Sequence, residues 1–333
     1  MPKIKKRFPV FIALSVLMCS CYGQENGAKI TLGFNLPLTG GLAAYGQNCL
    51  DGAKLALEQI AAEGVNGLLI RPVILDNRSE NADAALNSLR LAEIHAAAVI
   101  GPTNSNTAKS ALSNQSGMPA IIPSATADSL LPPGGGENCM FRICYTDSFQ
   151  GEAIGKYARE LGLCRAAVLT ESSSDYSRGV SEAFMRRFSG LGGLITSQEF
   201  YSSGECDFYM VLTRLAAQDF DALFVPGYYS EAGLIIRQMN ELGIKAAVLS
   251  GDAFDSPALE GIIGRREYLN NIYFTNHYAP GEAKSEDFFN AFTKKYGRDP
   301  SAYAALGYDS VMLFRDAYIR SAESGRTLLQ TLA

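Results

Sequence analysis

Strand-like and helix-like segments alternate along this chain, and the alternation constrains its fold more than any other feature. Residues 29–36 form an apolar run that ends at a Pro-Leu-Thr-Gly-Gly turn signal. Residues 46–62 carry apolar side chains at helical spacing. Further strands are expected at 68–75, 97–100 and 119–122, with helices at 82–95 and 106–115. This βαβαβαβ order predicts a parallel sheet covered by helices on both faces.

The alternation stops at a loop, 129–138, and then restarts. The loop contains a Pro-Pro-Gly-Gly-Gly run without a following Gly-Lys-Ser/Thr, so it is not a phosphate loop. Beyond it we expect strands at 166–170, 194–200, 222–226, 246–250 and 272–275, and helices at 177–191, 208–217, 231–242, 288–296 and 303–324. The predicted fold class is therefore α/β, with two Rossmann-like lobes, each a parallel sheet flanked by helices.

Small polar residues cluster directly after the expected strands, in the segments 39–46, 101–107, 123–126, 172–176, 226–229 and 251–255. In open α/β sheets the ligand site lies beyond the carboxyl ends of the strands. Hydroxyl residues at helix N-termini leave backbone N–H groups open to an anion such as a carboxylate. Each residue alone can be a helix cap, but the recurrence at one kind of strand end favours a ligand site between the lobes.

The N-terminus has the features of an export signal. Residues 3–7 include four basic side chains, and 8–18 is an apolar stretch too short to span a bilayer as a helix. The end of this stretch resembles a bacterial lipobox, although Met18 stands where Leu is usual. We therefore expect a signal peptide over 1–21 and lipidation at Cys21, with Cys19 or an ordinary cleaved signal as alternatives. Each places the protein outside the cytoplasm, in the periplasm or on the outer surface, and lipidation would anchor it to the membrane.

Composition excludes several classes of function. The net charge is −5 and no basic cluster follows the first seven residues, so a nucleic-acid partner is not expected. The chain has only two histidines, His95 and His277, which argues against a His-based metal site or a His-dependent nucleophile, and no cofactor is expected. Cys139 and Cys144 are the nearest cysteines in the mature body and could form a disulfide; free thiols are the alternative.

The order and spacing of the short motifs resemble the leucine/isoleucine/valine-binding protein family, whose members feed branched-chain amino-acid ABC importers. The resemblance begins near residue 29 and includes the segments 38–46, 100–105, 123–126, 141–151, 227–231, 250–252 and 299–303. It implies the type I periplasmic binding protein fold, with a hinge between lobe 1 (28–145 plus 276–333) and lobe 2 (146–275). A family member is expected to continue beyond Ala333 with closing strands and a further crossover.

The resemblance also implies roles for individual residues. Ser105 matches a serine that binds the ligand carboxylate, and Thr126 matches a threonine that contacts both its carboxylate and its ammonium group. Asp252 matches an acidic residue, Glu in the branched-chain binder, that pairs with the ammonium group. The remaining matched positions are a backbone carbonyl at Ser124 and aromatic walls at Tyr45, Tyr176, Tyr228 and Tyr303. The last of these is commonly Phe, so its hydroxyl makes a more polar amino acid or an amide a possible ligand.

These observations predict an extracytoplasmic substrate-binding protein of an ABC importer, which closes on an amino acid and is recognised by a permease with its ATPase. The alternative is a sensory receptor for an amide or another small polar solute. An enzyme is a weaker rival, based on 172–175 or on Asp252 with Asp255, because no Gly-x-Ser-x-Gly elbow occurs. We interpret Asp255 as a cap for the segment that starts at Ser256.

Overall fold

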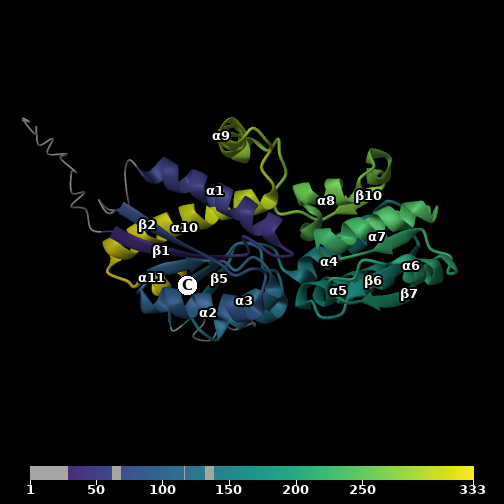
Figure 1. The fold of residues 1–333 in the computed structure, drawn as a ribbon, viewed down its shortest axis with the longest axis horizontal. Helices are drawn as coiled ribbons and strands as arrows, with labels where there is room; N and C mark the ends of the chain where they lie inside the picture. The colour runs from purple at the N-terminus through teal and green to yellow at the C-terminus, as the bar shows by residue number, and fades with distance from the viewer. Residues whose placement is uncertain (1–28, 62–68, 116, 132–138) are drawn as a thin grey trace, which may run out of the picture.

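Two five-stranded parallel sheets, each flanked by helices, form the two halves of the molecule (Figure 1). The computed structural model describes residues 29–61, 69–115, 117–131 and 139–333. The predicted signal peptide and lipobox, with Cys19 and Cys21, lie outside these residues. Within the described ranges, none of the helices combines the length and apolarity needed to cross a membrane.

The first sheet, which we assign to lobe 1, has the strand order β2-β1-β3-β4-β5. Its strands are β1 (Lys29–Leu36), β2 (Leu69–Asp76), β3 (Ala98–Ile100), β4 (Ala120–Ile122) and β5 (Met140–Arg142), and its helices are α1 (Ala43–Ala61), α2 (Asn81–Glu93) and α3 (Ser105–Leu112), with the 3-10 turn η1 (Asp128–Leu130). Buried side chains of α1 pack on one face, and those of α2 and α3 pack on the other. Helices cover both faces because each βαβ crossover is right-handed and the strand order changes direction after β2.

The second sheet, in lobe 2, has the strand order β10-β9-β8-β6-β7. Its strands are β6 (Arg165–Glu171), β7 (Leu194–Tyr201), β8 (Ala222–Phe224), β9 (Ala247–Ser250) and β10 (Ile272–Phe274), and its helices are α4 (Asp147–Glu160), α5 (Asp175–Gly190), α6 (Tyr209–Ala216), α7 (Tyr229–Glu241) and α8 (Pro257–Ile263), with the 3-10 turns η2 (Asp252–Phe254) and η3 (Arg266–Leu269). Its core is aromatic: the rings of Phe184 and Phe224 stack at 3.9 Å.

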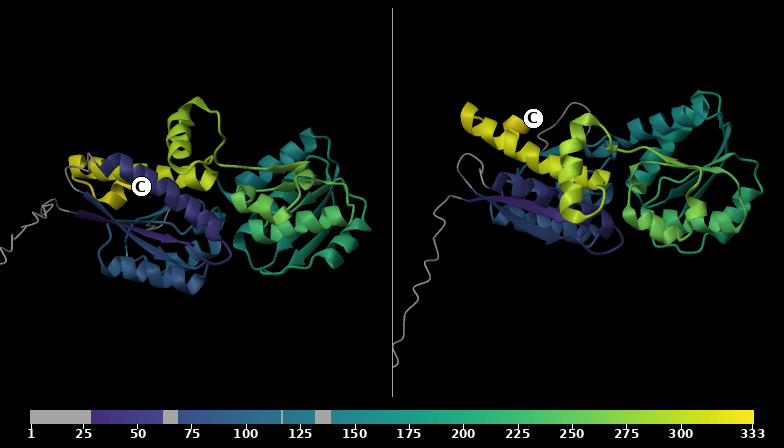
Figure 2. Two further views of the ribbon diagram at one scale, coloured as in Figure 1. Left: turned by 45° about the horizontal axis from the view of Figure 1, so that its top comes forward. Right: turned by 90° about the horizontal axis from the view of Figure 1, so that it is seen from above.

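The chain then returns to the first sheet through η4 (Ala283–Ser285), α9 (Glu286–Tyr296), α10 (Ala302–Ser324) and α11 (Leu328–Leu332). Helix α10 lies side by side with α1 (Figure 2). The contact is close enough that a Cβ added at Gly307 would lie 2.0 Å from the Cys49 carbonyl oxygen. Two segments far apart in sequence therefore complete lobe 1, although the exact predicted boundaries between the lobes stay a prediction.

Two sequence-based expectations need correction. Asp255 does not cap the segment after it: the hydroxyl of Ser256 accepts from the backbone N–H of Ala258 (3.3 Å) and caps α8 itself. Instead, Asp255 Oδ2 accepts from the N–H of Ala302 (2.5 Å) at the start of α10. The suggested disulfide between Cys139 and Cys144 is also absent, and all five cysteines of the described residues are free thiols.

Candidate ligand-binding site

A small cavity of about 10 Å³ lies where the two lobes meet. Its lining includes all eight residues predicted from the sequence, namely Tyr45, Ser105, Ser124, Thr126, Tyr176, Tyr228, Asp252 and Tyr303. Thr103, Asn104 and Ala253, which were not predicted, complete the wall. A cavity of this volume holds about one water molecule, so its walls must move apart to admit a solute. The carboxyl ends of both sheets supply the lining, because the loops there face each other.

The lobe 1 wall presents hydroxyl groups beside a helix N-terminus. Ser105 is the first residue of α3, and its Oγ accepts from the N–H of Ala127 (3.1 Å), which leaves the hydroxyl proton free to donate. Thr126 is also buried at this wall. The hydroxyl of Ser124 already donates to the carbonyl of Thr103 (2.9 Å), which favours the predicted backbone role for Ser124. Donors of this kind suit a carboxylate.

The lobe 2 wall presents one carboxylate, that of Asp252, which is only 2% exposed. Its Oδ2 lies 3.2 Å from Nε2 of His277, while Oδ1 has no hydrogen-bond partner among the described residues. His277 Nδ1 accepts from the N–H of Tyr145 (3.4 Å), so Nε2 carries the proton and donates to Asp252. A buried carboxylate is costly unless it is paired, and the free oxygen therefore points to a donor or cation supplied by a ligand.

The side walls are a cluster of tyrosines from both lobes. The ring of Tyr45 stacks on that of Tyr303 at 4.3 Å, and Tyr176 stacks on Tyr228 at 5.6 Å. Burial raises the pKa of all four hydroxyls, so each stays a neutral hydrogen-bonding group. The cluster offers flat apolar surface to a ligand and excludes water from its charged ends.

Sequence reasoning missed two titratable residues next to this cavity, His277 and Asp147. His277 follows the end of β10, as the predicted segments follow their strands, and this position could have revealed it. Asp147 begins α4 and is buried. Burial, the largest effect, raises the pKa of Asp147 well above its usual range, and the charge of Asp252 adds to the rise, whereas Thr126 and Arg142 oppose it.

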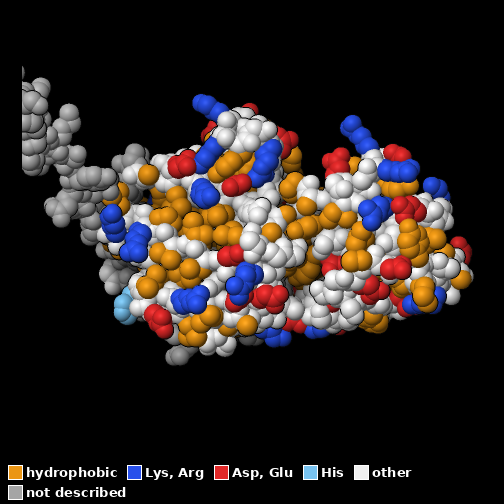
Figure 3. Space-filling view, viewed as in Figure 1, with side chains coloured by type: hydrophobic (Ala, Val, Ile, Leu, Met, Phe, Trp, Pro, Cys, Tyr) orange, Lys and Arg blue, Asp and Glu red, His pale blue; other side chains and the backbone are white. Residues whose placement is uncertain are grey.

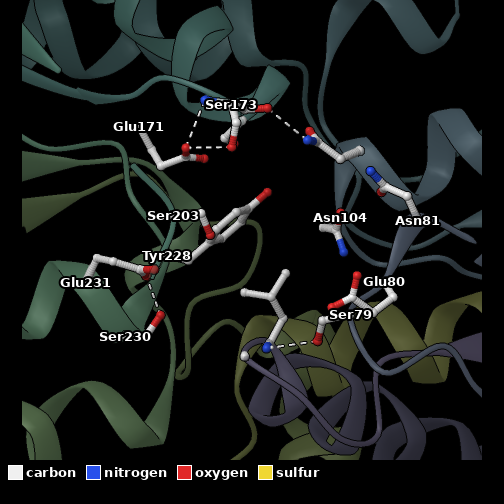
Figure 4. Close-up of a pocket in the computed structure, with 14 residues that line it drawn as sticks. Ser79, Glu80, Asn81, Asn104, Glu171, Ser173, Ser203, Tyr228, Ser230 and Glu231 are labelled. Carbon is white, nitrogen blue, oxygen red and sulfur yellow. Dashed lines mark hydrogen bonds between the residues drawn. The ribbon is translucent and has the colours of Figure 1, made fainter. Parts of the chain in front are cut away.

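An outer chamber of about 230 Å³ adjoins this small cavity and shares Asn104 and Tyr228 with it (Figure 4). Its other lining residues are Gly41, Leu42, Ser79, Glu80, Asn81, Asn106, Glu171, Ser173, Ser174, Ser203, Ser230 and Glu231. The side chains come from both lobes, and three of them are carboxylates. On the face shown in Figure 3, by contrast, basic and acidic groups are interspersed.

The residues that suggested an enzyme have structural partners. The hydroxyl of Ser173 donates to Glu171 (2.7 Å), and Ser174 caps α5 by accepting from the N–H of Ser177 (3.1 Å). Asp175 pairs with Lys109 across the lobes (2.9 Å) and with Arg178. Among the described residues, no group of three or more His, Cys, Asp or Glu side chains could hold a metal ion.

Comparison with known proteins agrees with this geometry. The sequence model of the family described as periplasmic binding protein matches residues 29–331. The chain belongs to the periplasmic binding protein family. This binding protein is 28% identical over 316 residues to an amino acid binding protein of Pseudomonas aeruginosa, covering 92% of this chain and 83% of the relative. It is 27% identical over 315 residues to Leu/Ile/Val-binding protein homolog 1 of Brucella abortus, covering 93% and 84%.

Solved structures show that this binding protein has the predicted fold. The branched-chain amino acid transporter substrate binding protein LivJ of Streptococcus pneumoniae, in complex with isoleucine, has a TM-score of 0.85 and 37% identity, covering 92% of this chain and 88% of that one. A leucine binding protein of Thermotoga maritima has a TM-score of 0.83 and 32% identity, covering 91% and 87%. The resemblance and the type I fold are confirmed, and family membership confirms an exported binding protein.

Proposed function

We propose that this protein is the extracytoplasmic receptor of an ABC importer and binds one free α-amino acid between its lobes. The observation that carries the proposal is that one lobe lines the cavity with a carboxylate and the other lines it with hydrogen-bond donors. A buried carboxylate with one free oxygen, that of Asp252, lies on the lobe 2 side. Hydroxyl donors beside the N-terminus of α3, at Ser105 and Thr126, lie on the lobe 1 side. The opposite charges of an amino acid match these two walls.

Binding of such a zwitterion drives closure for a simple physical reason. Its ammonium group pairs with Asp252 in one lobe, and its carboxylate accepts hydrogen bonds from Ser105 and Thr126 in the other. Each hydrogen bond to a charged group contributes about 1.5–3 kcal/mol. Because the partners belong to different lobes, both sets form only in the closed state, and the ligand therefore shifts the population towards closure. The closed form is the one that a permease recognises.

The relatives support the transport role over the sensory one. The pneumococcal structure is that of a transporter substrate binding protein with isoleucine bound, and the Thermotoga protein is a leucine binding protein. By this proposal the partners are a permease with its ATPase. A lipid anchor at Cys21 holds the receptor at the membrane surface next to them.

Isothermal titration of the purified mature protein with single amino acids tests the proposal. We expect Asp252→Asn to weaken the binding of the preferred amino acid at least 100-fold, since the ammonium group would be buried without a counter-charge. The variant keeps the size of the side chain, so its melting temperature should stay close to that of the wild type. The matched control is Asp316→Asn on the exposed side of α10, which should bind normally. Equal affinity in the wild type and in Asp252→Asn would refute the proposal.

A further inference from the structure

We propose that the amino acid bound by this protein carries a side-chain amide, which is recognised by Asn104 and Thr103. This inference rests on the proposed function, because it assumes that an α-amino acid occupies the cavity between the lobes. The class of substrate follows from unpaired polar groups in the wall beside that cavity and the outer chamber. Both residues lie at the end of β3, where the chain enters α3.

Asn104 lines both spaces and holds a fixed, buried hydrogen-bond donor without a partner among the described residues. Its side chain is 6% exposed, and its Oδ1 accepts from the N–H of Thr107 (3.0 Å) as the N-cap of α3. This bond fixes the amide orientation, because a flipped amide would place its NH2 group against another donor. Nδ2 has no hydrogen-bond partner among the described residues. In Figure 4 Asn104 lies at the wall of the chamber, across from Tyr228.

Thr103 adds a second unused polar group beside the first. It is 3% exposed, and its Oγ1 has no partner within the described part of the chain. An aliphatic ligand side chain in this place would leave both groups buried and unpaired, and a buried unpaired polar group weakens binding. A site built to hydrogen-bond its ligand discriminates strongly against an analogue that lacks the matching group. The wall therefore favours a polar side chain over that of leucine or isoleucine.

The chamber beyond Asn104 decides which polar group fits. Glu171 lines it and is 5% exposed, and both bonds from Ser173 reach the same oxygen, Oε1. A side chain that extends outward thus meets first a donor, Asn104 Nδ2, and then a carboxylate. A primary amide offers an acceptor oxygen and donor hydrogens together. A purely cationic side chain has no acceptor for Asn104, so the amide is the better match.

Competitive titration of the full-length mature protein with L-glutamine, L-asparagine, L-leucine and L-isoleucine tests this inference. We expect an amide ligand to bind at least tenfold more tightly than either aliphatic one. Asn104→Ser removes the donor but keeps an oxygen that can cap α3, and Thr103→Val removes the hydroxyl at nearly constant shape. The double variant should lose at least tenfold in amide affinity while it keeps or improves its affinity for leucine.

The control is Asn114→Ser, beyond the C-terminal end of α3 and outside both cavities, which should leave all four affinities unchanged. Tighter or equal binding of leucine or isoleucine by the wild type would overturn the inference and leave the proposed function intact. This comparison needs no variant, so a folding defect cannot obscure it. Failure to bind any free amino acid would overturn the proposed function, and this inference with it.

Discussion

The hydroxyl of Tyr45 in lobe 1 donates a 2.6 Å hydrogen bond to the carbonyl oxygen of Ala253 in lobe 2. The same hydroxyl accepts from the backbone N–H of Tyr229, at 3.1 Å, also in lobe 2. One buried side chain thus makes two bonds that cross the cleft. Because these bonds require the lobes to be close together, Tyr45 stabilises the closed state independently of its contact with a ligand.

Tyr45→Phe should therefore weaken ligand binding without removing the aromatic wall. The ring can keep its stack on Tyr303, while both bonds across the cleft are lost. At about 0.5–1.5 kcal/mol per bond, we expect a dissociation constant about 5- to 150-fold higher. Calorimetry gives the affinity, and small-angle scattering with and without ligand gives the population of closed molecules. Tyr209→Phe, on the exposed face of α6 where the hydroxyl bonds to Glu241, is the control. An unchanged affinity would show that Tyr45 does not contribute to closure.

The close crossing of α1 and α10 gives a stability prediction. A Cβ at Gly307 would lie 2.0 Å from the carbonyl oxygen of Cys49, so the helices would have to separate. Gly307→Ala should therefore destabilise the protein by about 1–3 kcal/mol or more, although alanine is the better helix former by about 1 kcal/mol. Gly190→Ala at the end of α5 meets no atom within 4 Å and should be neutral or slightly stabilising. Urea unfolding of both variants measures the difference; equal stabilities would mean that the crossing adapts to a methyl group.

Asp147 makes stability depend on pH in a defined direction. Burial raises the pKa of its carboxyl in the folded state. Below the unfolded pKa of about 3.9 the group is protonated in both states and costs nothing. As the pH rises through the folded pKa, ionisation favours the unfolded state and stability is lost. Asp147→Asn has no such titration, so its free energy of unfolding relative to the wild type should increase from pH 4 to pH 8.

Urea unfolding without ligand at several pH values between 4 and 8 measures this difference. A difference that stays constant over the range would contradict the assignment. The ligand must be left out, because a bound ammonium group near Asp252 would stabilise nearby negative charge and mask the effect.

The alternation of strands and helices in the sequence predicted every strand of the two sheets except the edge strand β5, and the bounds of β1 agree with the prediction. Helix α4 was missed for a physical reason. It packs closely on α5, where a Cβ at Gly151 would lie 2.5 Å from the Cβ of Ala183. Such a contact needs small residues, so the buried face of α4 consists of Asp147, Gln150, Gly151, Ile154, Gly155 and Ala158. This face has no apolar stripe that a periodicity argument could detect.

Site residues were predictable from sequence where their role follows from their position after a strand. They were not predictable where the role depends on a polar atom that stays without a hydrogen-bond partner in the folded protein. Tyr45 and Asp252 follow strands in recognisable motifs, and the structure places both at the cavity. Asn104 is different, because its Oδ1 is an ordinary helix cap. Whether its Nδ2 finds a partner depends on segments distant in sequence. His277 also acquires its role only when β10 carries it beside Asp252.

Asp255 connects the segment that carries Asp252 to α10, the helix that completes lobe 1. Its Oδ2 accepts from the N–H of Ala302 (2.5 Å) and from Nδ2 of Asn276 (3.1 Å), and the next residue of α10, Tyr303, enters the cavity. Asp255→Ala would leave the N–H of Ala302 without its acceptor, at a cost of about 1–3 kcal/mol. We expect a lower melting temperature together with weaker ligand binding, since Tyr303 loses its support.

Asp255→Asn distinguishes the hydrogen bond to Ala302 from the negative charge of Asp255 as the cause of these effects. Its amide oxygen can still accept from Ala302, and burial already disfavours the ionised carboxyl by raising the pKa of Asp255. The variant should therefore recover most of the stability and affinity that Asp255→Ala loses, as measured by thermal unfolding and calorimetry. If Asp255→Asn is as impaired as Asp255→Ala, then the charge of Asp255, and not its hydrogen bond to α10, maintains the site.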